Sequence, residues 1–137
     1  MIESRSLVTG RYAETDMMGI VYHANYLPWF EVSRTTLFKE LGIPYRQLEA
    51  EGYHLPVLEI SAKYLRPAVY DDTLEIVATL AEKPTVRVRL TYEVRRDGEV
   101  LATGSSVHAF VDRRGHPARP PAWVVERIDK AFRKSAA

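Results

Sequence analysis

The 137-residue sequence contains no cysteine, which excludes disulfide bridges, thiol nucleophiles and cysteine-based zinc sites. It also carries almost no net charge, because 19 Lys and Arg residues against 18 Asp and Glu residues give +1. The overall charge therefore does not favour binding to nucleic acid. No apolar run approaches the roughly 18 residues that a membrane-spanning helix requires. Residues 1–11 lack the apolar segment of a secretory signal, and we therefore expect a cytoplasmic protein.

Motifs of several common enzyme classes are missing as well. The sequence has no Walker or dinucleotide-binding glycine pattern, which leaves nucleotide hydrolysis and hydride transfer without support. Ser105 and Ser106 follow Gly104, but this segment is not a G-x-S-x-G nucleophile elbow. We expect no metal site, because no ligand spacing such as H-x-x-x-H relates the four histidines, which are His23, His54, His108 and His116.

A helix is expected to begin at Asn25, which is a plausible N-cap. Pro28 would then fall in the first turn, where a missing N–H costs little. The body over residues 29–41 carries spaced apolar side chains and no glycine. Gly42 suits the position just past the helix end, and Pro44 prevents continuation.

From residue 55 onward, apolar residues recur with a period of two. Strict alternation over residues 58–64, 73–80 and 86–95 predicts strands with one buried face and one wetter face. The Asp97-Gly98 turn then leads into a further long strand over residues 100–111. Short links between these segments predict antiparallel neighbours.

These elements predict an α+β fold, a long antiparallel sheet of about five strands wrapped around one central helix, in a single domain over residues 1–137. The remaining elements are a first strand over residues 7–12 and a C-terminal helix over residues 123–132. One helix cannot cover both faces of such a sheet, and long edge strands need protection, so we expect self-association.

One loop combines groups that can perform acyl chemistry. Asp16 lies in a glycine-containing loop that runs into the helix start at Asn25, and its carboxylate could act as a nucleophile or a general base. N–H groups at a helix start lack intrahelical partners and can stabilise negative charge on a carbonyl oxygen. The alternative is that Asp16 only forms an Asx turn or a helix cap.

The neighbours of Asp16 have weaker signals. His23 could donate to a carbonyl, move a proton or position water, or it could be an ordinary surface or capping histidine. Asn25 is favoured as a cap rather than a catalyst. Val21, Tyr22 and Tyr26 would make the walls of an apolar site.

Basic residues gather in two segments. Such charges usually form a solvated sheet face, but they could bind phosphate groups of a cofactor-linked substrate. The two groups are Lys83, Arg87 and Arg89, and Arg113, Arg114 and Arg119.

The loop resembles the hotdog-fold acyl-CoA thioesterases of the 4-hydroxybenzoyl-CoA thioesterase type. The most specific block is Tyr12-x-Glu14-Thr15-Asp16-x-x-Gly19-Ile20-Val21-Tyr22-His23-Ala24-Asn25-Tyr26, followed by Trp29-Phe30-Glu31. Two further blocks are similar to the family, namely Tyr64-Leu65-Arg66-Pro67-Ala68-x-Tyr70-Asp71-Asp72 and Val107-His108-Ala109-Phe110-Val111-Asp112. Together the blocks cover roughly residues 5 to 121.

The resemblance implies a hotdog fold with sites at a dimer interface and Asp16 as the catalytic carboxylate. The N–H of residue 23 would polarise the thioester carbonyl, and His23 itself matches a branch with short or aromatic acyl substrates. Coenzyme A (CoA) would be held by surface basic residues, with Lys83 near the family's basic segment. The other implied substrate contacts are Val21, Tyr22, Asn25 and Tyr26.

The predicted reaction is hydrolysis of a small-molecule acyl-CoA to a free acid and CoA, with no metal or redox cofactor, since CoA is part of the substrate. A homodimer or homotetramer is expected, without nucleic acid or a membrane span. One rival is a thioesterase for acyl chains on a carrier protein, and another is a non-catalytic acyl-CoA-binding module. A hydratase is disfavoured because the motifs that carry its acid/base pair are not found.

Overall fold

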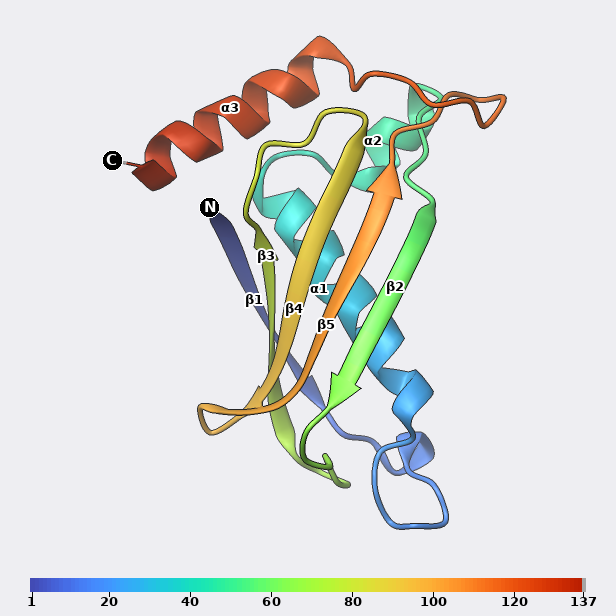
Figure 1. Ribbon diagram of the computed structural model, residues 1–137, viewed down its shortest axis with the longest axis vertical. Helices are drawn as coiled ribbons and strands as arrows, with labels where there is room; N and C mark the ends of the chain where they lie inside the picture. The colour runs from blue at the N-terminus through green and yellow to red at the C-terminus, as the bar shows by residue number, and fades with distance from the viewer. Residues whose placement is uncertain (137) are drawn as a thin grey trace.

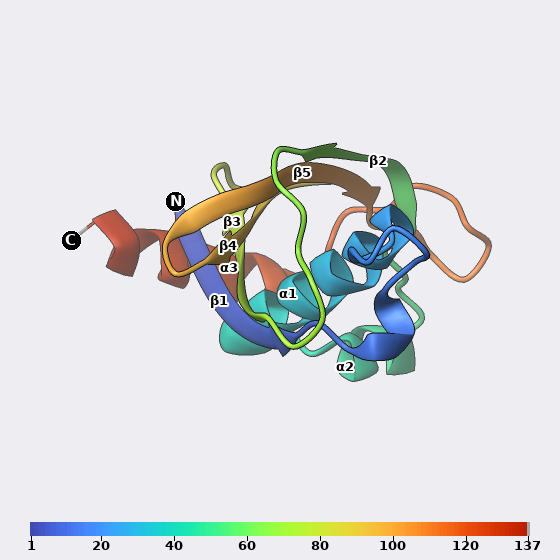
Figure 2. The same ribbon diagram turned by 90° about the horizontal axis from the view of Figure 1, so that it is seen from below.

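In the computed structural model, which describes residues 1–136, a five-stranded antiparallel sheet curves around one long helix. The sheet has the order β1-β3-β4-β5-β2, and Figure 2 shows it arching over α1. The strands are β1 (Ile2–Thr9), β2 (Val57–Tyr64), β3 (Thr73–Leu80), β4 (Arg87–Arg96) and β5 (Glu99–Ala109). The helices are α1 (Tyr26–Glu40), α2 (Tyr45–Ala50) and α3 (Ala122–Ala136), with short 3₁₀ turns at Tyr12–Glu14 and His23–Asn25. The predicted α+β architecture is confirmed.

Helix α1 fills the concave side of the sheet and forms the centre of the core. Phe30, Leu37 and Phe38 are completely buried against the strands. The helix ends as predicted: Gly42 takes a positive φ of 80°, and the N–H of Ile43 donates to the carbonyl of Phe38 at 2.8 Å. This is the Schellman arrangement that a glycine past the last helical turn permits.

The first strand is displaced from its predicted position over residues 7–12. β1 is Ile2–Thr9 and pairs with β3 along its whole length. It stops at Gly10, whose N–H donates to the Asp72 carbonyl at 2.9 Å, and a side chain there would lie 2.7 Å from the Val69 carbonyl oxygen. The end of β1 is therefore held by the segment just before β3, which leaves no room for a side chain at residue 10, and a local pattern does not reveal this contact.

The alternating strands behave as predicted in the middle of the sheet but not at its edge. In β4, Val88, Leu90 and Val94 are buried, as the two-residue period requires. The prediction of one buried face is wrong for β2 within this chain, because Leu58 and Ile60 remain 46% and 39% exposed. β2 is the edge strand at the far side of the sheet from β1 and β3, against which α1 mainly packs, so this face of β2 is left largely uncovered.

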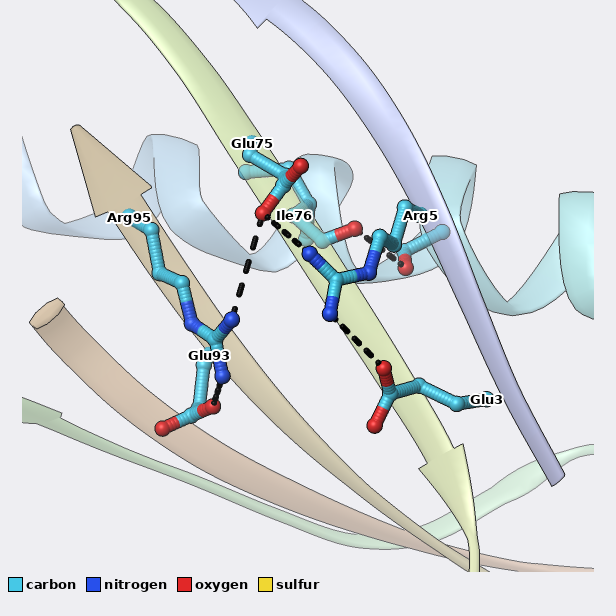
Figure 3. A network of polar contacts seen from close by, with 7 residues as sticks. Glu3, Arg5, Glu75, Ile76, Glu93 and Arg95 are labelled. Atoms are coloured by element: carbon cyan, nitrogen blue, oxygen red, sulfur yellow. Dashed lines mark hydrogen bonds and ion pairs between the residues drawn. The ribbon is translucent and has the colours of Figure 1, made fainter. Parts of the chain in front are cut away.

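The convex face of the sheet is polar. Figure 3 shows Arg5 of β1 bonded to Glu3 and, at 3.1 Å, to Glu75 of β3. Arg95 of β4 also lies within ion-pair distance of Glu75 and bonds to Glu93. These charges make this part of the convex face the wetter face of the sheet.

The C-terminal helix α3 is also confirmed. It buries Val124 and Ile128, and the indole N–H of Trp123 donates to Glu51 at 2.8 Å. In Figure 1 α3 lies at the top of the molecule, while the loop between β1 and α1 lies at the bottom. None of the helices in residues 1–136 is long and apolar enough to cross a membrane.

Candidate active site

The loop that carries Asp16 is a compact, hydrogen-bonded structure between the two 3₁₀ turns. Its ends meet at a bridge between Thr15 and Val21, and the N–H of Asp16 donates to the carbonyl of Ile20 at 2.9 Å. Gly19 makes the reversal with a positive φ of 79°. The loop therefore holds its aspartate on a defined backbone.

The Asp16 carboxylate has one structural contact and one free oxygen. Oδ1 accepts the N–H of Met18 at 2.8 Å, which is the Asx turn that the sequence left open as an alternative. Oδ2 makes no hydrogen bond or ion pair with any residue between 1 and 136. The turn fixes the side chain and leaves half of the carboxylate available.

Asp16 lies at the wall of a cleft of about 420 Å³. Val21, His23 and Tyr26 line the same cleft, so the structure brings together four of the predicted site residues. The other lining residues are Met18, Ile20, Tyr64, Leu65, Arg66 and Pro67. The lining is mainly apolar, which favours an uncharged group next to the carboxylate.

Backbone donors are available at one side of this cleft. His23 begins the 3₁₀ turn that leads into α1, and the N–H groups of His23 and Ala24 have no acceptor among the residues that the structure describes. The first N–H groups of a helical segment lack intrahelical partners, and the helix dipole adds partial positive charge there. Such N–H groups can donate hydrogen bonds to a substrate oxygen and stabilise negative charge on it.

Asn25 precedes α1 as predicted, but it does not cap the helix. Its backbone is already helical, and its side chain makes no capping hydrogen bond. Nδ2 instead donates to the carbonyl oxygen of Glu14 at 2.8 Å. Asn25 therefore ties the helix start to the beginning of the Asp16 loop and does not line the cleft.

The far wall of the cleft comes from the end of β2, which the residue patterns did not identify as part of a site. Tyr64 Oη donates to the carbonyl of His23 at 2.9 Å, and the rings of Tyr64 and Tyr26 meet edge to face with centroids 5.0 Å apart. Burial raises the pKa of Tyr26, so its phenol stays protonated. The only sequence signal for this wall is the block that begins at Tyr64, which contributes to the family resemblance.

Two further predicted substrate contacts, besides Asn25, also lie outside the cleft. Tyr22 is about half exposed, and its ring packs on that of His23 with centroids 4.4 Å apart. Lys83 lies in the turn between β3 and β4, where its Nζ is 3.2 Å from Asp129 of α3. This turn is at the opposite end of the sheet from the cleft, so the contact of Lys83 with CoA stays a prediction.

Residues 1–136 contain no cluster of three or more His, Asp or Glu side chains arranged to hold a metal ion. The chemical groups that the cleft does present are one carboxylate, unpaired peptide N–H groups and an apolar lining.

The chain matches the thioesterase-like superfamily over residues 11–128. Among curated proteins, a putative acyl-CoA thioesterase of Bacillus subtilis, YneP, is 39% identical over 111 residues, which are 80% of each chain. A 1,4-dihydroxy-2-naphthoyl-CoA hydrolase of Thermosynechococcus vestitus is 27% identical over 130 residues, which are 90% of this chain and 89% of the relative.

Solved structures give the same relationship. A DHNA-CoA thioesterase from Staphylococcus aureus superposes with a TM-score of 0.87 at 30% identity, covering 99% of this chain and 92% of its own. A 4-hydroxybenzoyl-CoA thioesterase has a TM-score of 0.83 over 93% of this chain and 99% of its own. At 19% identity, the second comparison shows the shared fold alone, which is the hotdog fold.

Proposed function

The chain belongs to the thioesterase-like superfamily and is a thioesterase, and we propose that it hydrolyses acyl-CoA thioesters to a carboxylic acid and CoA. The observation that carries this proposal is the placement of Asp16 and His23 in one apolar cleft, beside unpaired backbone N–H groups. The names of the relatives support CoA as the carrier of the acyl group.

In the proposed reaction, the free Oδ2 of Asp16 acts at the thioester carbonyl. It either attacks the carbon, giving an acyl-aspartate anhydride that water then hydrolyses, or removes a proton from an attacking water. In both routes the carbon–sulfur bond breaks, and the CoA sulfur leaves with the electron pair and takes up a proton. A carboxylate and water are sufficient for this chemistry, so the proposal includes no metal or redox cofactor.

The N–H groups of His23 and Ala24 would hold the carbonyl oxygen as it gains negative charge. One preorganised donor of this kind is typically worth about 10² to 10³ in rate. The apolar lining strengthens the effect, because hydrogen bonds to a charged oxygen are stronger where water is excluded. The His23 ring is exposed, and its N–H carries the proposed role without help from the imidazole.

The acyl group would lie against Val21 and Tyr26, the two buried apolar residues of the cleft that were predicted as contacts. Tyr22 would contact substrate only at the rim, and Asn25 would act by holding the loop. Lys83 could reach CoA only if a second copy brings that end of the sheet to the cleft.

A homodimer formed along β2 meets that condition. This edge strand has an unpaired hydrogen-bonding side and exposes Leu58 and Ile60. Both features favour pairing with another strand. Antiparallel pairing of two copies would place the far end of one sheet beside the cleft of the other. A homotetramer would need a second contact surface. The convex face, which carries the polar network, is less apolar than the β2 edge.

The direct test is release of free thiol from a panel of aliphatic and aromatic acyl-CoAs, run beside the same acyl groups on a carrier protein. We expect turnover of CoA esters in the wild type and a loss of several orders of magnitude in Asp16→Ala. Faster turnover of the protein-bound esters would make the chain a carrier-protein thioesterase. Binding without thiol release would identify the rival binding module.

A further inference from the structure

Tyr64 connects β2 to the turn that carries the unpaired N–H groups. It is the last residue of the strand, and its hydroxyl donates to the carbonyl oxygen of His23 at 2.9 Å. This hydrogen bond joins two cleft walls that are 41 residues apart in the chain. Nothing in the proposed chemistry uses it directly.

The bond acts on peptide groups that bear the proposed donors. The carbonyl of His23 belongs to the same planar peptide as the N–H of Ala24, so fixing the oxygen fixes the direction of that N–H. The backbone N–H of Tyr26 also bonds to this oxygen, and the Tyr64 hydroxyl is its side-chain donor. The preceding peptide is held in the same way, because the Tyr22 carbonyl accepts the N–H of Asn25 at 2.9 Å. Both free N–H groups therefore belong to peptides whose oxygens are already hydrogen-bonded.

We propose that Tyr64 is a positioning residue for thioester hydrolysis: its hydroxyl holds the His23 carbonyl and thereby directs and polarises the backbone donors for the substrate oxygen. The inference rests on the proposed function. A carbonyl that accepts a hydrogen bond makes the N–H of its own peptide a better donor, because hydrogen bonds in a chain polarise one another.

The surroundings of Tyr64 suit this role. Its ring packs edge to face on that of Tyr26, with centroids 5.0 Å apart, and Tyr26 is almost completely buried. This packing holds the Tyr64 ring in place next to His23. Partial burial raises the pKa of Tyr64, which keeps its hydroxyl in the donor form at neutral pH. Because the proton of Tyr64 is committed to His23, Tyr64 is not assigned a proton-transfer role.

The test compares Tyr64→Phe with the wild type, with Tyr70→Phe as a matched control. Tyr70 is 58% exposed and lies outside the cleft, and its hydroxyl has no hydrogen-bond partner in residues 1–136. Loss of one neutral hydrogen bond that acts on the transition state should lower kcat of Tyr64→Phe about tenfold and leave KM within about twofold. Tyr70→Phe should match the wild type.

A second measurement reports on the peptide itself. In a ¹H–¹⁵N spectrum, the amide proton of Ala24 should move upfield in Tyr64→Phe, because that N–H is less polarised without the phenol. An unchanged Ala24 amide would overturn the inference even if kcat fell, because Tyr64 would then act by another route.

Asp16→Asn, assayed in parallel, separates this inference from the proposed function. If Asp16→Asn is inactive while Tyr64→Phe keeps its kcat within twofold of the wild type, the positioning role of Tyr64 is wrong and the proposed function stands. If Asp16→Asn is fully active, the proposed mechanism fails and this inference fails with it.

Discussion

Asn25 Nδ2 donates a 2.8 Å hydrogen bond to the carbonyl oxygen of Glu14, which joins the start of α1 to the loop that carries Asp16. The same carbonyl accepts the N–H of Tyr22 at 2.8 Å. One peptide oxygen thus holds the two ends of the segment that places the carboxylate next to the free backbone donors. The relative position of these proposed catalytic groups depends on this contact.

Replacing Asn25 by Asp should loosen the loop. A carboxylate has no N–H to donate, and it would face the Glu14 carbonyl with like partial charge. We expect the free energy of unfolding to fall by about 1 to 2 kcal/mol and kcat to fall about tenfold. Urea unfolding and the thiol-release assay measure the two effects, and wild-type values in both would contradict the assigned contact.

Gly104 of β5 should not tolerate a methyl group. An added Cβ would overlap the ring of Phe30 and lie 2.9 Å from the carbonyl oxygen of Ser61. Phe30 cannot move away easily, because it is completely buried and stacks on Tyr92 with ring centroids 4.5 Å apart. Gly104→Ala should therefore lower the free energy of unfolding by about 1 to 3 kcal/mol or more.

Gly115→Ala is the control for this substitution, because Gly115 has open space around it and would suffer only from its positive φ of 79°. Chemical unfolding of the two variants should show the larger loss for Gly104→Ala. A larger loss at Gly115 would mean that the contact between α1 and β5 is looser than described.

His108 should make stability depend on pH. Burial, together with the nearby guanidinium of Arg34, lowers the pKa of His108 to about 4. The unfolded chain takes up the proton near pH 6.5, so between pH 6.5 and 4 the unfolded state holds more protons than the native state. The free energy of unfolding should consequently fall on acidification, by up to about 1.4 kcal/mol per pH unit from this residue.

Urea unfolding between pH 4.5 and 7.5 measures this slope. His108→Gln should flatten it, whereas substitution of the exposed His116 by Gln should leave it nearly unchanged. Equal slopes in the wild type and His108→Gln would show that His108 is not held neutral in the core.

Ile60→Lys should separate the proposed dimer. Ile60 is exposed on the edge strand β2, and a charge there would be buried without a partner when two edges pair. Light scattering coupled to size exclusion should give the mass of two chains for the wild type and of one chain for Ile60→Lys. Glu59→Lys, on the other face of the same strand, should remain dimeric. A wild-type mass of one chain would overturn the dimer.

The elements that local chemistry determines were predictable. Gly42 and Pro44 mark the end of α1 in the sequence alone, and the two-residue period marks β4. Contacts between segments that are distant in the sequence were not predictable. β1 ends where residues 69–72 contact Gly10. Whether the apolar face of β2 is buried depends on what packs against it, and the sequence of the strand does not contain that information.

The site divides in the same way. The sequence indicated Asp16 and the backbone donors, because a loop aspartate before a helix start is a local pattern. The prediction for Asn25 was wrong, because its side chain donates to the carbonyl oxygen of Glu14, eleven residues earlier, and does not cap the helix. The sequence patterns also missed the contact of Tyr64 with His23, since nothing in a strand pattern says what lies beyond the strand end.

The most direct test of the proposed mechanism is kcat of Asp16→Asn on an acyl-CoA that the wild type hydrolyses. The amide can keep the acceptor for the Met18 N–H, so the Asx turn and the fold should persist, while the charged oxygen is lost. We predict an unchanged unfolding temperature and a kcat at least about 10³-fold lower, in line with the loss of a nucleophile or general base. A folded Asp16→Asn protein with wild-type turnover would contradict the central role of this carboxylate.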